Sequence, residues 1–264
     1  MIDIFKNLFM KAPDSEHDGI YRFGNERDGD HFDELDFQFW HEIGFKNKWN
    51  TTAFFENKCT EQMLKQIING HENIIDLACG PGMGFIPSIK KMAPSFPCLA
   101  TDASFSVLNE WKKYLDSHEK YADLGFAQFS LFNIPINDGS VSAYSSFIGI
   151  SSTRNGESGY NTALSEIHRT LKSGGLLYTV ETEWTDIAQI LELFKSNNKQ
   201  PWDCFIQQSK KWEELFIECG FNILYNEIFE ERKLTRKDNE LGEMSEKDHV
   251  DIWLKFSGFI LEKR

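Results

Sequence analysis

The sequence predicts an α/β protein built on a parallel sheet, and two stretches indicate this. Residues 73–89, NIIDLACGPGMGFIPSI, begin as a short apolar run of buried-strand length, turn at Gly80 and Gly82, and continue with apolar residues at helical spacing. Twenty residues after Gly82, Asp102 follows a second short apolar run. A carboxylate at that place can accept hydrogen bonds from both hydroxyls of a ribose.

The run of residues 75–82, IDLACGPG, resembles the first motif of the class I S-adenosylmethionine-dependent methyltransferases. Dinucleotide-binding enzymes use G-x-G-x-x-G, whereas this turn has G-x-G-x-G and places Phe85 where the third glycine would stand. The resemblance covers residues 54–264. It implies a seven-stranded, mostly parallel sheet with helices on both faces and an antiparallel carboxyl-terminal hairpin, and S-adenosylmethionine as the cofactor. The alternative is a Rossmann-like turn that binds no ligand.

Composition narrows the class of protein. The chain has 264 residues, of which 41% are hydrophobic, enough for one large domain or one domain with a small cap. No apolar run reaches the length of about 18 residues that a membrane span needs. A formal charge of −13 repels phosphate backbones and argues against nucleic-acid substrates. The five cysteines lack C-x-x-C or zinc-like spacing, so we expect a reduced, cytoplasmic protein that holds no metal.

Residues 1–53 precede the region of resemblance, and we expect them to form a small helical cap. Residues 28–33 alternate acids with other residues, but they lack the ligand spacing and terminal Glu of a calcium-binding EF-hand loop, so a solvated acidic face is favoured. Flat side chains of this segment are expected to contact the substrate, with core packing as the alternative for each: Tyr21, Trp40, His41 and Trp49.

From residue 54 onward, helices and strands alternate. A helix over 54–69, with apolar residues at every fourth position and Gly70 after it, leads into the glycine module. Ser104 is expected to cap the next helix. Later strands are predicted at 125–129, 141–150 and 176–181, helices at 160–171 and 212–219, and two final strands at 221–231 and 249–261, joined by a charged loop at 232–248. Residues 185–213 exceed an ordinary crossover, and we interpret them as a helix with a cap insertion.

The resemblance also implies which residues bind the cofactor: Asp76, Ala78, Gly80, Gly82, Asp102, Ala103, Ser130, Leu131 and Phe147. Gly82 would leave room for the amino-acid part of the cofactor, and Leu131 would offer its backbone N–H to the adenine ring. Two positions depart from the family pattern. Ser130 stands where an Asp usually accepts the adenine amine, and Ser142 stands where an Asp usually opens the fourth strand. A hydroxyl accepts that hydrogen bond more weakly than a carboxylate does.

The expected function is methyl transfer from S-adenosylmethionine to a small molecule or a peptide side chain. Such a transfer depends mainly on positioning and a dry site, so the sequence identifies no catalytic residue. Glu181, at the end of the fifth strand, and His41 are candidates, and Trp184 is expected to contact the substrate. Two alternatives stay open: a non-catalytic protein that binds S-adenosylmethionine or S-adenosylhomocysteine, and a nicotinamide-dependent oxidoreductase.

Overall fold

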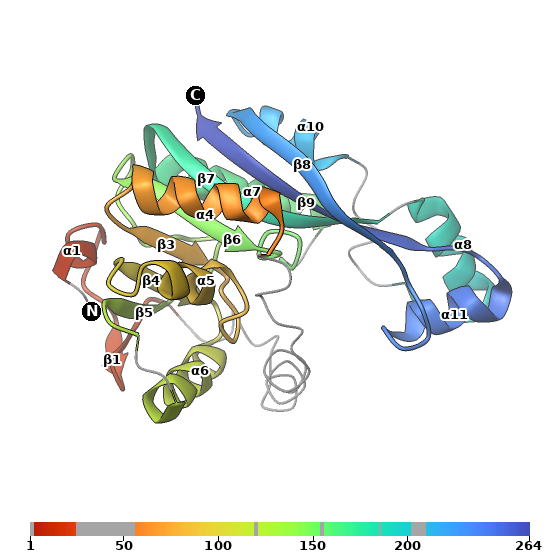
Figure 1. Ribbon diagram of the computed structural model, residues 1–264, viewed down its shortest axis with the longest axis horizontal. Helices are drawn as coiled ribbons and strands as arrows, with labels where there is room; N and C mark the ends of the chain where they lie inside the picture. Colours follow the sequence, from red (N-terminus) through yellow and green to blue (C-terminus); the bar gives the residue numbers. More distant parts are fainter. Residues whose placement is uncertain (1–2, 25–55, 119–120, 154–155, 185, 202–209) are drawn as a thin grey trace.

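The fold is described here from a computed structural model, which covers residues 3–24, 56–118, 121–153, 156–184, 186–201 and 210–264 (Figure 1). Within these residues the chain forms one nine-stranded mixed sheet in the order β1-β2-β5-β4-β3-β6-β7-β9-β8. The strands are β1 (Ser15–His17), β2 (Ile20–Arg22), β3 (Ile74–Leu77), β4 (Cys98–Asp102), β5 (Leu124–Gln128), β6 (Val141–Phe147), β7 (Leu171–Trp184), β8 (Phe221–Lys233) and β9 (Trp253–Lys263).

Helices cover both faces of the sheet, as predicted (Figure 1). One face carries α4 (Lys58–Gly70), α5 (Phe85–Met92) and α6 (Phe105–His118), and the other carries α1 (Asp3–Lys6), α7 (Gly156–Thr170) and α10 (Trp212–Glu218). Each face has its own apolar core, and the central strand β3 is buried along its whole length. A strand buried on both faces is typical of a parallel sheet between two helical layers.

Local sequence explains where these helices begin. The side chain of Asn57 accepts a hydrogen bond from the backbone N–H of Thr60 and so caps α4. The predicted four-residue period then buries Cys59, Met63 and Ile67. Ser104 precedes α6, and its Oγ lies 3.4 Å from the backbone nitrogen of Val107, in agreement with the expected cap.

The sheet has nine strands, so the expected number of seven was wrong. The seven expected strands are present, and β1 and β2, from the segment expected to be a helical cap, extend the sheet beyond β5. Ile20 and Arg22 of β2 pair in parallel with Phe126 and Gln128. This pairing places Ile20 in the buried core. Besides β1 and β2, the described part of the segment contains only the one-turn helix α1.

The carboxyl-terminal part also differs from the prediction. The stretch expected to be a charged loop holds the end of β8 and a helix, α11 (Glu240–Asp248). Asn239 caps α11, and Leu241 and Met244 are buried, so this mostly charged helix has one apolar side. The outermost strand, β8, pairs antiparallel with β9, and its register shifts twice, between Ile223 and Tyr225 and between Ile228 and Glu230.

Helices α8 (Ile187–Ser196) and α11 lie together beyond one edge of the sheet, next to the far end of the β8–β9 ribbon (Figure 1). This is the carboxyl edge of the parallel strands, because β7 leads into α8 and the start of β9 pairs with the end of β7 at Trp184 and Leu254. Among the described residues, no helix has the length and apolar character needed to cross a membrane.

Candidate functional site

From β3 the sheet continues through β4 and β5 on one side and through β6 and β7 on the other, so the boundary between β3 and β6 is the topological switch point. Ligands of α/β sheets bind at such a point, in the crevice outside the carboxyl ends of the strands. The turn after β3 contains Ala78, Gly80 and Gly82, with φ values of 48°, 54° and 82°. Glycine adopts positive φ freely, whereas an alanine there is strained. The predicted strand, glycine turn and helix are therefore confirmed, with the turn at the switch point.

Gly82 is required by packing inside the protein. A Cβ atom added to Gly82 would lie 2.1 Å from Cε2 of Trp111, a fully buried side chain of α6. The space beside this glycine, expected to receive the amino-acid part of the cofactor, is filled by an indole ring. Gly80 differs, because a Cβ atom there would meet no atom within 4 Å. Contact of the cofactor with the backbone of either glycine stays a prediction.

Asp76, the last residue but one of β3, is 1% exposed. Its Oδ1 accepts a hydrogen bond from the hydroxyl of Ser145 at 2.6 Å, while its Oδ2 has no hydrogen-bond partner among the described residues. Burial raises the pKa of this carboxyl to about 7, against the lowering effect of the Ser145 hydroxyl and the backbone N–H of Ile86. The N–H of Ile86 thus partly compensates the buried carboxyl, and Oδ2, which no described residue meets with hydrogen-bond geometry, is the acceptor atom left for the donor of a ligand.

Asp102 lies at the carboxyl end of β4, one strand away from Asp76. Its Oδ2 accepts a hydrogen bond from the N–H of Gly80, and its Oδ1 accepts one from the N–H of Ser104, both at 2.9 Å. Burial raises the pKa of this carboxyl, and these N–H groups oppose the rise. Asp102 thus holds the glycine turn against the start of α6, a role that the sequence did not predict, and its contact with a ribose stays a prediction.

Two further polar side chains at this edge were missed. Gln128, the last residue of β5, pairs with Asp102; its Nε2 donates to the carbonyl of Ala103, and its buried Oε1 has no described partner. Ser146 of β6 is also buried, and its hydroxyl has no described partner. For Gln128 the available signal was its position near the carboxyl end of the strand predicted at 125–129, whereas Ser146 lies in the middle of the strand predicted at 141–150 and gave no such signal.

The remaining predicted cofactor residues lie along the same edge. Ser130 and Leu131 directly follow β5, and the Ser130 hydroxyl accepts a hydrogen bond from the N–H of Phe132 at 3.1 Å. Phe147 ends β6, and its Cβ would lie 3.3 Å from a Cβ atom added to Gly84. The nine predicted cofactor residues therefore lie at the carboxyl ends of four neighbouring strands, β5, β4, β3 and β6.

The predicted substrate and catalytic residues are dispersed. Trp184 ends β7 at the carboxyl edge, whereas Tyr21 lies within β2, paired with Ala127 and packed against the core, which favours its packing alternative. Glu181 is fully buried under the turn after β6. Trp40, His41 and Trp49 lie outside the described residues, as does the acidic stretch 28–33.

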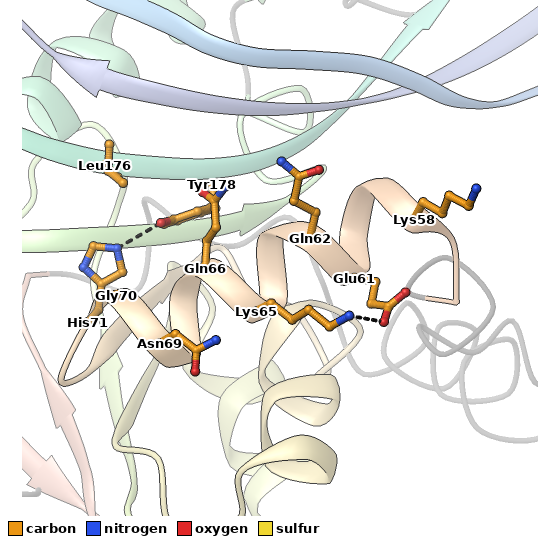
Figure 2. A pocket seen from close by; sticks show the side chains of 10 residues that line it. All are labelled: Lys58, Glu61, Gln62, Lys65, Gln66, Asn69, Gly70, His71, Leu176 and Tyr178. Carbon is orange, nitrogen blue, oxygen red and sulfur yellow. Dashed lines mark hydrogen bonds and ion pairs between the residues drawn. The ribbon is translucent and has the colours of Figure 1, made fainter.

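A groove of about 750 Å³ runs between α4 and β7 (Figure 2). At one end, Nε2 of His71 and the hydroxyl of Tyr178 are hydrogen-bonded at 3.0 Å, next to the start of β3 and therefore at the edge opposite the glycine turn. Burial lowers the pKa of His71 and raises that of Tyr178, so both are neutral at pH 7. None of the predicted cofactor residues lines this groove.

Comparison with known families identifies the class of the chain. The sequence model of the ubiE/COQ5 methyltransferase family matches residues 43–200, more than half of the chain. The chain belongs to the ubiE/COQ5 methyltransferase family. Membership confirms the expected class, an S-adenosylmethionine-dependent methyltransferase, and the expected cofactor.

Individual relatives of this methyltransferase family member are distant. A demethylmenaquinone methyltransferase from Lactococcus lactis subsp. lactis (strain IL1403) is 28% identical over 172 residues, covering 56% of this chain and 65% of the relative, just under two thirds of its length. A putative methyltransferase from Bacillus halodurans C-125 is 17% identical, with a TM-score of 0.57 over 78% of this chain and 98% of the other. A protein from Pyrococcus horikoshii OT3 is 16% identical, with a TM-score of 0.55 over 88% and 100%. These two solved structures show a shared fold.

The polar atoms of the methyltransferase crevice fit S-adenosylmethionine. The buried acceptor atoms without a described partner, Oδ2 of Asp76 and Oε1 of Gln128, suit a ligand that brings ammonium, hydroxyl and amine donors. The carboxylate of Asp102 accepts hydrogen bonds from the N–H groups of Gly80 and Ser104, and the N–H of Ala103 acts on it as well, whereas a carboxylate has about four acceptor sites in total. At least one acceptor site of Asp102 therefore remains, and its use by a ribose hydroxyl stays a prediction.

Proposed function

We propose that the protein transfers a methyl group from S-adenosylmethionine to a small organic acceptor. The observation that carries this proposal is the set of buried acceptors around one glycine turn at the switch point of the sheet: the unpartnered Oδ2 of Asp76, and Asp102 with Gly80 bonded to it. Family membership supplies the class of reaction. The charge of −13 argues against a nucleic-acid acceptor.

Each residue has a distinct proposed task. The cofactor, once bound, supplies an electrophilic methyl group on a sulfonium. Asp102 accepts hydrogen bonds from the ribose, and Asp76 Oδ2 accepts from the ammonium group. Gln128 Oε1, two residues before Ser130, adds an acceptor on the side of the expected adenine position, where Ser130 offers only a hydroxyl. Together they fix the cofactor so that the acceptor can approach the methyl group in line. Methyl transfer by this route needs no strong base if the acceptor is already nucleophilic.

The walls of the acceptor pocket are proposed to come from segments beyond the carboxyl edge. Trp184 ends β7 there, α8 follows, and α11 packs against α8. The described chain before Trp40, His41 and Trp49 ends at Gly24, just after the carboxyl end of β2. The described chain after them begins just before α4, and Cys59 of α4 lies near Gly258, which pairs with Val180 near the end of β7. Both points lie on the crevice side, so Trp40, His41 and Trp49 remain proposed substrate contacts.

For the acceptor we propose a demethylated quinone-type ring as the first compound to test, because the curated relative is named as a demethylmenaquinone methyltransferase. A peptide side chain is the second class. Either is compatible with a cytoplasmic protein, which stays a prediction. Glu181 is not proposed as a base, since it is fully buried and both its oxygens accept hydrogen bonds within the protein.

The test has two steps. Calorimetric titration with S-adenosylmethionine, S-adenosylhomocysteine and NADH should show binding of the first two and none of the third. Mass spectrometry of reactions with a demethylated quinone, or with a peptide mixture, should then reveal a gain of one methyl group that needs the cofactor. Binding without methylation of any acceptor would favour the non-catalytic alternative, and binding of NADH alone would reject the proposal.

A matched pair of variants tests the site itself. Asp76→Asn keeps the shape of the side chain but removes the negative charge that the carboxyl carries above its pKa of about 7. At a pH of about 8 it should weaken binding of S-adenosylmethionine at least about tenfold, the value of one hydrogen bond to a charged group. Glu166→Gln is the control, because Glu166 is half-buried near Arg169 and the N–H of Ile134, away from the glycine turn. Equal affinities in the wild type and Asp76→Asn would contradict the assignment.

A further inference from the structure

Glu181 is a charged residue type placed where no water reaches it. It belongs to β7, is 0% exposed, and lies on the sheet face covered by α7 and α10. Its Oε1 accepts a hydrogen bond from the hydroxyl of Thr179 at 2.5 Å, and its Oε2 accepts one from the backbone N–H of Ser151 at 2.9 Å. Burial of a carboxyl is costly, so its presence requires a reason beyond stability.

Ser151 belongs to the turn of residues 148–153, which connects β6 to the next segment and borders the switch point. The turn begins with Ile148 at a φ of 58°, a conformation strongly disfavoured for a β-branched residue. Four hydrogen bonds lie within the turn: the N–H groups of Ser152 and Thr153 donate to the carbonyls of Ile148 and Ile150, and the hydroxyls of Ser151 and Thr153 donate to the same two carbonyls. Strained backbone of this kind persists only where its surroundings hold it.

The turn of residues 148–153 packs closely against the glycine turn. A Cβ atom added to Gly149 would lie 2.9 Å from Cβ of Ala78 and 3.0 Å from the carbonyl oxygen of Leu77. Ala78 is itself strained, with a φ of 48°. A continuous line of contacts therefore runs from Glu181 through Ser151 and Gly149 to the backbone that is proposed to hold the cofactor.

We propose that Glu181 is a positioning residue, which fixes the turn of residues 148–153 through Ser151 and thereby keeps the glycine turn in its cofactor-binding conformation. This inference rests on the proposed function, since it concerns the same crevice. It replaces the sequence-based expectation that Glu181 acts as a base. A base must reach the acceptor, whereas both oxygens of Glu181 are engaged beneath the turn.

Three substitutions separate a positioning role from the alternatives. Glu181→Leu keeps the volume but leaves the N–H of Ser151 without its acceptor. Glu181→Gln keeps an acceptor for Ser151; its amide can donate to the hydroxyl of Thr179, which then donates to the carbonyl of Ser146, 3.3 Å away. Tyr144→Phe is the matched control, because it removes a buried hydrogen bond, to Thr170, from the same sheet layer but away from the turn. If Glu181→Leu yields no folded protein, Glu181→Ala, which admits water to Ser151, takes its place.

The readouts are the dissociation constant of S-adenosylhomocysteine by calorimetry and the deuterium uptake of the peptide that covers residues 148–153. We expect Glu181→Leu to weaken binding at least tenfold and to speed exchange in that peptide, while Glu181→Gln and Tyr144→Phe stay within threefold of the wild type. Unchanged binding in Glu181→Leu would overturn the proposal, as would equal losses in Glu181→Leu and Glu181→Gln or a similar loss in Tyr144→Phe.

The two proposals fail in different ways. If the wild type itself binds no S-adenosylhomocysteine, the proposed function fails. The exchange measurement still decides whether Glu181 holds the turn, because it needs no ligand.

Discussion

Replacing Gly82 with alanine should destabilise the protein, because the added Cβ atom would overlap with the side chain of Trp111; a smaller residue at position 111 should relieve this overlap. The added Cβ would stand 2.1 Å from Cε2 of Trp111, so the indole ring or the turn must move. Overpacking of this kind costs about 1–3 kcal/mol, and the positive φ of 82° adds roughly 1–2 kcal/mol for an L residue. The free energy of unfolding should therefore fall by about 2–5 kcal/mol, less than most domains have in total.

A double-mutant cycle separates the two contributions. Trp111→Leu removes the ring atoms that collide, so the Gly82→Ala, Trp111→Leu double variant should be about 1–3 kcal/mol more stable than the sum of the single effects. Gly80→Ala is the matched control. Its φ is also positive, at 54°, but its added Cβ would meet no atom within 4 Å, so it should cost only the backbone strain and show no coupling to Trp111.

Urea unfolding followed by circular dichroism measures all six proteins: the wild type, the three single variants, and the two double variants that combine Trp111→Leu with Gly82→Ala or with Gly80→Ala. Tryptophan fluorescence is not used, because the number of tryptophans differs among them. Strictly additive effects of Gly82→Ala and Trp111→Leu would refute the packing explanation. So would a Gly80→Ala variant as unstable as Gly82→Ala.

Two further predictions concern the carboxylates of the crevice. Asp102→Ala should lower both the stability of the protein and its affinity for S-adenosylmethionine, because the N–H groups of Gly80 and Ser104 lose their acceptor at a cost of about 1.5–3 kcal/mol each. Asp102→Asn should retain part of the stability. Thermal melts measure the stability and calorimetry measures the affinity. The free energy of unfolding should fall as the pH rises from about 4 to above 7, since the folded protein keeps protons on Asp76 and Glu181 up to a pKa of about 7 while the unfolded chain loses them near 3.8 and 4.5. Each group should contribute on the order of 3 kcal/mol, Glu181→Gln should remove its share, and stability that instead rises across this range would contradict the burial of both groups.

Much of the crevice was predictable because its signals are local in sequence. The spacing of the glycine turn and of Asp102 placed both at strand ends, and the structure brings them together, with the N–H of Gly80 bonded to Asp102. Apolar periodicity likewise located α4, α6 and the strands of the parallel sheet. These elements depend on a few adjacent residues, so a single sequence suffices to place them.

What was missed depends on contacts between distant segments. β1 and β2 are three residues each, and their pairing beside β5 is not encoded in any local pattern. Trp111 reads as an ordinary core residue of a helix until its distance from Gly82 is known. Glu181 ends the predicted strand 176–181, a position that suggests a catalytic candidate, but the sequence does not show that it is buried or that it accepts a hydrogen bond from the N–H of Ser151, 30 positions earlier.

The exposed rim of the sheet bears on how the protein behaves at high concentration. In the described chain β8 is an outermost strand of 13 residues, long enough to pair with the same strand of another molecule and so to nucleate aggregates. Its two register shifts interrupt a regular row of hydrogen-bonding groups, and its second half carries Glu227, Glu230, Glu231, Arg232 and Lys233. Both devices discourage strand addition. Replacing these charged residues with β-branched residues would therefore raise the strand propensity of β8 but lower the solubility of the protein.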